Sequence, residues 1–221
     1  MPSPSEMVRD AFLATAAEAR GVIASRAVGA KWTEPSALDD LAVGALAGHL
    51  ARAAFVVVGY LDASDADAIA RDGAELLTAD QYFERIVPPP EMAEELHSGV
   101  RARAAQEATE GQAALLARLD ATLNDLDERF ATEPATRAVK VAGGLVLPLD
   151  EYLVTRMVEL VVHCDDLAAS IGAETPGFDP MTMACVIGCM LAMVRARHGD
   201  IAVVRAFARR ERDLIDALRA F

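Results

Sequence analysis

Basic residues and aromatic residues are both scarce in this 221-residue chain. It has 21 Lys and Arg against 34 Asp and Glu, which gives a formal net charge of −13 at pH 7. Without a basic surplus to neutralise phosphates, the composition argues against nucleic-acid binding and against docking on an anionic membrane surface. Aromatic residues make up 5% of the chain, and hydrophobic residues, many of them alanine, make up 53%. The composition therefore predicts a folded, alanine-rich and mainly helical protein.

Cysteines and long uncharged apolar runs are also few. Cys164, Cys185 and Cys189 all lie in apolar stretches, and this small, odd number does not form a disulfide framework, so a reducing, cytoplasmic setting is expected. Cys185 and Cys189 have a spacing that suits a metal, but small buried hydrophobes are the favoured interpretation. No segment reaches the ~18 uncharged apolar residues of a membrane span, and the first residues, MPSPSEMVRD, do not resemble a signal peptide.

Hydrophobic spacing predicts two long helices in the first third of the chain. Residues 7–28 repeat apolar side chains at intervals of three and four, as an amphipathic helix does. Residues 38–61 contain the stretch LAVGALAGHLARAAFVVVGYL, which is apolar on nearly all sides and is therefore expected at the centre of the fold. The polar interruptions of this second helix are His49, Arg52 and Tyr60.

The middle of the chain is less regular. Residues 62–80 are acidic and are expected to form a loop with a helical turn, and residues 81–86 a short helix that ends at three prolines. Residues 91–130 are predicted to form one long helix that Gly111 bends.

The last third contains a hairpin signal and further helices. Gly143 and Gly144 separate two β-branched runs within residues 137–147, which indicates a tight β-hairpin. The helices expected after it cover residues 150–171, 180–197 and 200–221. The predicted fold is therefore mainly all-α: a four-helix bundle, a small hairpin before its fourth helix, and a C-terminal helical pair. We expect the bundle to occupy residues 1–175 and a helical extension packed on it to occupy residues 176–221.

Two side chains that are energetically costly to bury lie inside the predicted fourth helix. Glu159 and His163 are four residues apart, which places them on one helical face about one turn from each other. A carboxylate and an imidazole on a buried face require partners, and a divalent metal is one such partner. His49 lies in the other long apolar helix, so it completes a set of three ligands if the second and fourth helices face each other.

Three protein ligands leave an open coordination position, as in catalytic metal sites. Nitrogen and carboxylate donors suit zinc, while iron, nickel and manganese remain alternatives. Hydrogen-bonded core side chains without a metal are the competing interpretation of the same residues.

Four further residues are expected near this site. Asp166 lies on the stripe of Glu159 and His163 and is expected to orient His163 by accepting its second ring N–H. Arg52 and Arg156 are each expected either to bind a substrate carboxylate through a bidentate fork or to pair with an acid in the bundle. Tyr60 is expected to supply a site hydroxyl or to pack at the helix end.

Two stretches resemble the signature regions of a known family. AGHLARA around His49 and EYLVTRMVELVVHCDDLA around Glu159 and His163 are similar to those of the mycothiol-dependent maleylpyruvate isomerase family, which are DinB-like four-helix bundles. RARHGDIAVVRAFARRER resembles the tail of an actinobacterial subgroup of that family. The resemblance implies a divalent metal, typically zinc, on His49, Glu159 and His163, with mycothiol as the thiol.

One departure from the family bears on the substrate. After Gly172 the chain predicts two helices, whereas the isomerase itself has a separate small α/β domain after its bundle. The resemblance therefore implies the thiol-handling bundle rather than the isomerase's own reaction.

The expected chemistry uses a thiolate held on the metal, because the metal's charge favours the deprotonated thiol. Its attack on a small electrophile leads to S-transfer or to thiol-dependent cis–trans isomerisation. Metal-assisted hydrolysis with water as nucleophile is an alternative. A further alternative is a non-enzymatic metal- or thiol-sensing bundle that uses its C-terminal helices as a homodimer or partner surface.

Overall fold

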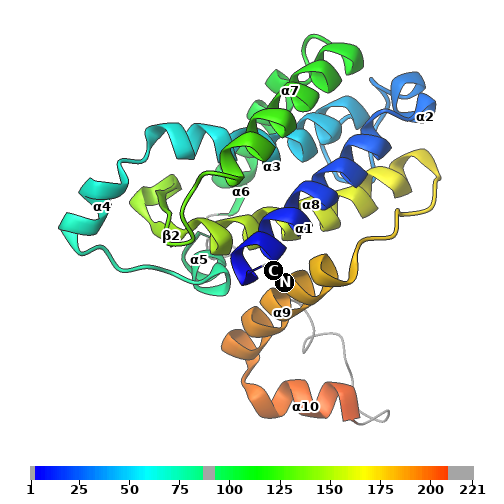
Figure 1. The fold of residues 1–221 in the computed structure, drawn as a ribbon. Coiled ribbons are helices and arrows are strands. Elements are labelled where there is room, and N and C mark those ends of the chain that lie inside the picture. Colours follow the sequence, from blue (N-terminus) through cyan, green and yellow to red (C-terminus); the bar gives the residue numbers. More distant parts are fainter. Residues whose placement is uncertain (1–2, 87–92, 209–221) are drawn as a thin grey trace.

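Four long helices form a bundle at the centre of the molecule (Figure 1). The computed structural model describes residues 3–86 and 93–208, and the side chains of all of these except residues 93–97. The bundle helices are α1 (Pro4–Ile23), α3 (Val43–Ala63), α7 (Gln112–Phe130) and α8 (Leu149–Ile171). Both α1 and α3 pack against α7 and against α8, which closes the bundle around one core. The mainly helical, DinB-like bundle predicted from the sequence is confirmed.

The core follows from the apolar stripes of these helices. On α3, Leu46 and Leu50 are fully buried, and on α8, Leu153 and Met157 face the same core. Burial of each such side chain contributes about 1.5–3 kcal/mol relative to its exposure. Helix α8 ends at Ile171, and the following Gly172, with a φ of 71°, provides the left-handed cap. The site-bearing helices α3 and α8 are therefore held by packing along most of their length.

The first two predicted helices have different bounds in the structure. Helix α1 ends at Ile23, and a separate short helix, α2 (Arg26–Ala30), begins after Ser25, whose hydroxyl accepts from the backbone N–H of Val28. Helix α3 begins at Val43 and not near residue 38. The chain turns before it because Asp40 has a φ of 62°, which is incompatible with helix.

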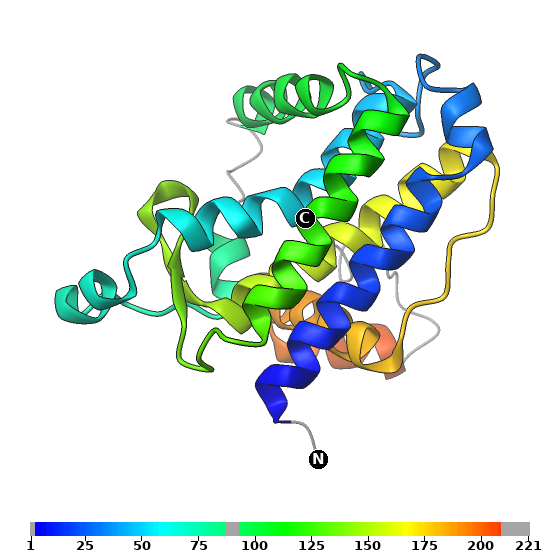
Figure 2. The ribbon, with the colours of Figure 1, turned by 45° about the horizontal axis from the view of Figure 1, so that its top comes forward.

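The prediction of a single long helix over residues 91–130 was wrong. The chain forms α6 (Ala93–Glu107) and α7, separated by a break at which Gly111 has a φ of 84°. Figure 2 shows that the two helices run in different directions. Helix α6 packs on α3, whereas α7 packs on both α1 and α3. The break between α6 and α7 therefore lets α6 cover an additional face of α3. Residues 91–92 lie outside the described residues.

The acidic stretch before α6 contains two short helices. Residues 62–80, expected as a loop with a helical turn, include α4 (Ala66–Asp72). The predicted short helix is present as α5 (Ala79–Ile86), and its three following prolines lie outside the described residues. Glu151 on α8 accepts a hydrogen bond from the backbone N–H of Ala79 at 2.8 Å. This contact attaches the start of α5 to the start of α8.

The predicted hairpin is present and leads directly into α8. Strands β1 (Ala138–Lys140) and β2 (Val146–Pro148) are antiparallel, with Val139 opposite Leu147. Gly143 and Gly144, with φ of 72° and 75°, turn the chain at the 3₁₀ turn η2 (Ala142–Gly144). Glycine is needed at both positions because other residues rarely adopt this backbone conformation.

Two helices follow the bundle, as predicted. Helix α9 (Pro180–His198) begins after Asp179, whose carboxylate accepts from the backbone N–H groups of Met181 and Thr182. It packs on α8, α5 and α1, and α10 (Asp200–Ala208) packs on α9. The predicted continuation of the last helix through residues 209–221 lies outside the described residues. The division into units 1–175 and 176–221 and the homodimer remain predictions.

Two described helices, α3 and α9, are long and apolar enough to meet a membrane-span criterion based on length and composition. In the structure, 67% of the relevant window of α3 is buried, against 28% for α9. Because core helices meet the same criterion, this finding is weak support for a membrane span.

Candidate metal centre

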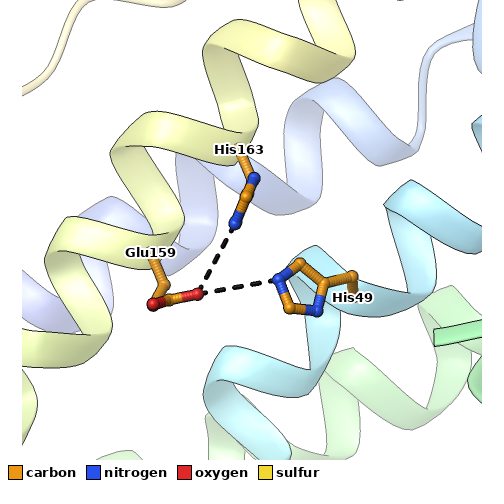
Figure 3. A group of neighbouring side chains, drawn as sticks. All are labelled: His49, Glu159 and His163. Carbon is orange, nitrogen blue, oxygen red and sulfur yellow. Dashed lines mark ion pairs between the residues drawn. The ribbon is translucent and has the colours of Figure 1, made fainter. Parts of the chain in front are cut away.

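His49 from α3 and the pair Glu159 and His163 from α8 converge on one point, and we refer to these residues as the triad (Figure 3). Their ligand atoms all lie within 4.8 Å of one another. The four-residue spacing on α8 stacks Glu159 and His163 on one face, and the packing of α3 against α8 supplies His49. The side chains retain between 18% and 26% of their surface, so the cluster is accessible to a small molecule.

The spacing of the triad atoms fits a metal better than direct hydrogen bonds. Glu159 Oε2 lies 3.6 Å from His49 Nε2 and 3.5 Å from His163 Nε2. Both distances exceed those of ordinary N–H···O hydrogen bonds. They are close to the ~3.4 Å ligand–ligand separation of a tetrahedral site with bonds of about 2.1 Å. The donor set and its spacing thus fit a divalent cation with an open coordination position.

Asp166 fixes the orientation of one triad imidazole. Its Oδ2 lies 2.9 Å from His163 Nδ1, so that Nδ1 donates and Nε2 is directed toward Glu159. A carboxylate behind a ligand histidine in this way sets its tautomer and increases its basicity. The neighbouring Asp165 is exposed and instead accepts a hydrogen bond from Thr175.

The electrostatics of the triad favour a charged carboxylate. Burial raises the pKa of Glu159, but the two imidazoles and Arg156 outweigh it and hold that pKa well below its usual range. Burial lowers the pKa of His163, but the hydrogen bond to Asp166 and the negative charges of Glu159 and Asp166 outweigh it and raise the pKa to about 9. The same arrangement that attracts a proton to His163 also attracts a metal cation, because both compete for Nε2.

Arg52, one of the expected substrate-binding residues, is paired within the protein. Its Nη1 donates to Glu107 Oε1 on α6 at 2.8 Å. Arg118 on α7 binds the other oxygen of Glu107, and its guanidinium lies 3.9 Å from the ring centroid of Phe55. Glu107 therefore joins α3, α6 and α7 beside the site, and both of its oxygens are engaged.

Arg156, the other expected substrate-binding residue, lies among tyrosines. Its guanidinium carbon is 5.0 Å from the ring centroid of Tyr152, and its Nε donates to Thr155 Oγ1 at 3.1 Å. Tyr60 on α3 and Tyr82 on α5 pack edge-on against Tyr152, with ring centroids at 5.5 Å and 6.3 Å. The structure thus places Tyr60 with Arg156 and not in the triad.

Neither Tyr82 nor Glu107 was predicted from the sequence as a neighbour of the site. Both lie in stretches whose position relative to the bundle depends on long-range packing, so neither helical spacing nor motif points to them. Tyr82 lies in the short helix α5, which Glu151 attaches to α8. The only local signal for Tyr82 was an aromatic side chain in the short helix predicted for residues 81–86.

The three cysteines do not join the site. No disulfide links them, and among the described residues the triad is the cluster with metal-binding geometry. Burial raises the pKa of Cys164 to about 12 and that of Cys189 to about 12. Burial also raises the pKa of Cys185. The protein's own thiols therefore remain protonated near neutral pH.

The fold and the triad define a class: a DinB-like helical bundle with a candidate metal centre between its second and fourth helices. A family model described as the mycothiol maleylpyruvate isomerase N-terminal domain matches residues 13–168. The chain therefore belongs to this family. Comparison with curated proteins and with solved structures found no match. The matched region contains the whole triad and ends before α9.

Proposed function

We propose that the protein binds one divalent metal ion, zinc by donor type, through His49, Glu159 and His163. The convergence of two imidazoles and one carboxylate on a partly exposed point carries this proposal. When bound there, the cation stabilises a thiolate at its open position. The family to which the chain belongs indicates mycothiol as the source of that thiol.

The reaction class we propose is thiol-dependent transfer or isomerisation on a small electrophile. The thiol loses its proton to solvent on binding, and its sulfur forms a new C–S bond with the electrophile. In S-transfer the bond between that carbon and a leaving group breaks, the leaving group departs with the bonding electron pair, and the conjugate is the product. In isomerisation the π bond of the electrophile breaks as the C–S bond forms, and its electron pair moves to the conjugated group. After rotation about the remaining single bond, that pair re-forms the double bond, the C–S bond breaks, and the thiolate is regenerated. The high pKa values of the protein's cysteines support a thiol that comes from a cosubstrate.

The residues of the chain supply position and charge. Asp166 holds His163 in the tautomer that presents Nε2. Glu159 contributes one negative charge, so a divalent cation on the triad retains about one net positive charge, which attracts an anionic sulfur. Helices α3 and α8 are buried along their core faces, and this rigidity keeps the ligands in place.

Metal content tests the proposal directly. Full-length protein purified from zinc-supplemented cells is expected to contain one equivalent of metal by elemental analysis, and His163→Ala less than a tenth of that. Asp165→Asn is the control, because Asp165 is on the same helix but points away from the triad. Melting temperatures show whether His163→Ala folds. Metal-free wild type, or a full equivalent of metal in folded His163→Ala, contradicts the proposal.

Thiol binding distinguishes the reaction classes. Cobalt-substituted protein is expected to develop sulfur-to-cobalt charge-transfer absorption when mycothiol is added. A metal-loaded protein whose spectrum does not respond to mycothiol refutes the thiol-dependent reaction and favours hydrolysis by bound water.

Removal of the carboxylate behind His163 is expected to weaken the site without abolishing it. Asp166→Asn keeps the shape of the side chain but removes the charge that supports the imidazole. We expect metal affinity, measured by chelator competition, to fall about tenfold. Asp165→Asn makes the same chemical change one residue away and is expected to leave metal affinity unchanged. Equal losses in the two variants would show a general effect of charge on the helix.

A further inference from the structure

Helix α9 is apolar along its length but is largely exposed. Only 28% of its most apolar window is buried, against 67% for the central helix α3. Ile187 in the middle of α9 is 56% exposed. Exposed apolar surface of this kind commonly marks a site of contact with another molecule. Within the described residues, four of the five large hydrophobic side chains that are exposed belong to α9 and α10: Ile187, Ile201, Val204 and Phe207.

The exposed and the packed sides of α9 lie opposite each other. Val186 and Cys189 are buried in the core that α9 shares with the bundle. At 3.6 residues per turn, Ile187 and Gly188 lie about half a turn away from them. Figure 1 shows α9 and α10 at one edge of the molecule, beyond the four bundle helices. We refer to the exposed and half-exposed residues on this side as the outer face of α9, and they are Pro180, Ala184, Ile187, Gly188, Leu191 and Arg195.

The order of side chains along the outer face is complementary to itself. If a second α9 lies antiparallel, with the axis between residues 187 and 188, Ile187 lies opposite Gly188 of the partner subunit. In the same register Ala184 lies opposite Leu191 of the partner subunit. Each pair joins a large side chain to a small one. An added Cβ at Gly188 meets no atom within 4 Å, so this position is open to receive the isoleucine. Such pairing, in which each contact occurs twice, is the property of a two-fold symmetric interface.

Charges at the two ends of α9 favour the same antiparallel register. Asp179 caps the first turn of α9, and Arg195 lies in its last turn. The register that pairs Ile187 with Gly188 also places Pro180 opposite Arg195 of the partner subunit, and therefore brings that arginine close to Asp179. Within one chain Arg195 donates to Asp200 at 2.7 Å, but both side chains are exposed, so this ion pair contributes little. A parallel arrangement would instead bring like charges together at each end.

The overall distribution of charge also selects this part of the molecule for self-association. Residues 176–208 contain three arginines and two aspartates, whereas the whole chain has a net charge of −13. The excess of acidic residues therefore lies outside α9 and α10. Because like charges oppose association, two copies repel each other least where these helices meet.

We propose that two copies of this chain form a homodimer in which the outer faces of α9 pack antiparallel about a two-fold axis. Helix α10 packs on α9, and its exposed apolar side chains enlarge the apolar surface at this edge of the molecule. The triad lies between α3 and α8 and is not part of the interface, so each subunit keeps its own candidate metal centre. The interface also lies beyond residue 168, where the match to the family model ends.

The molar mass in solution tests the dimer. Sedimentation of the full-length protein at micromolar concentration is expected to give twice the 23.5 kDa of one chain. Ile187→Glu places a charge at the centre of the interface, so we expect the dissociation constant to rise at least thirtyfold, that is by about 2 kcal/mol or more of lost binding. Leu76→Glu is the matched control, because Leu76 is 53% exposed and lies outside α9 and α10. It is expected to leave the dissociation constant unchanged.

Gly188→Leu distinguishes the proposed register from general adhesion of apolar surfaces. The new side chain starts in open space within one copy, but it fills the position that Ile187 of the partner subunit occupies. We therefore expect the dissociation constant to rise about tenfold or more. Adhesion without a register would instead become stronger, because the substitution adds apolar surface. Gly21→Leu makes the same change at an open position on α1 and is expected to have no effect on the dissociation constant.

Several outcomes would overturn the dimer. A wild-type protein that stays monomeric at every concentration contradicts it, and so does a folded Ile187→Glu variant that still dimerises. A monomer that dimerises only as Leu218→Glu would show that residues 209–221 cover the outer face. A monomer that sediments with phosphatidylcholine vesicles, and no longer does so as Ile187→Glu, would show membrane docking instead. Melting temperatures verify that each variant folds, and none of these measurements depends on metal or thiol.

Discussion

The two arginines beside the triad, Arg52 and Arg156, differ in the side chains that they contact. Arg52 and Arg118 share the two oxygens of Glu107, whereas Arg156 has tyrosine rings around it and forms no ion pair with a described side chain. We refer to the first group as the α6 flank and to Arg156 with its tyrosines as the α5 flank. Ion pairs therefore hold the α6 flank together, whereas aromatic packing holds the α5 flank.

A contact outside the triad builds the α6 flank. At Gly48, next to His49, an added Cβ would lie 2.6 Å from the backbone oxygen of Ala104 on α6. The absence of a side chain at Gly48 thus lets α6 approach α3 closely. This approach brings Glu107, one turn further along α6, to Arg52.

Gly48→Ala is expected to disturb the α6 flank most. The new methyl group meets a backbone atom that cannot rotate away, so α6 has to shift. Overpacking of this kind costs about 1–3 kcal/mol, which exceeds the ~0.5–1 kcal/mol that alanine gains over glycine in a helix. We expect a net loss of about 1–2 kcal/mol in the free energy of unfolding, measured in urea.

Gly59→Ala provides the matched control within the same helix. An added Cβ at Gly59 meets nothing within 4 Å. The substitution is therefore expected to leave stability unchanged or to raise it by up to about 1 kcal/mol. Equal destabilisation by the two substitutions would show that Gly48 is not needed for the approach of α6.

The α8 side of the site could be predicted from the sequence because its order is local. Helical spacing alone stacks Glu159, His163 and Asp166 on one face, and the structure shows the contact of His163 with Asp166 at 2.9 Å. His49 was added on the assumption that two apolar helices face each other, and they pack as expected. The hairpin before α8 was predictable because two consecutive glycines mark its turn.

The flanks could not be predicted because long-range packing determines them. The sequence around Gly111 fits either one bent helix or two helices, and only the packing of α6 on α3 decides between them. For the same reason the alternatives for Arg52 and Arg156 remained open. The partner of Arg52 is 55 residues away in the chain. The position of Tyr82 likewise depends on the attachment of α5 to α8.

Neutralisation of Glu107 offers the sharpest contrast between the flanks, although its expected effect is smaller. Glu107→Gln keeps the shape of the side chain but removes the charge that Arg52 and Arg118 share, so we expect a loss of about 1 kcal/mol in the free energy of unfolding. Arg156→Gln breaks no ion pair with a described residue, so we expect a smaller loss than for Glu107→Gln. Urea unfolding of both variants in the metal-loaded form measures the difference. The reverse order would mean that Arg156 stabilises the fold more than the ion pairs of Glu107 do.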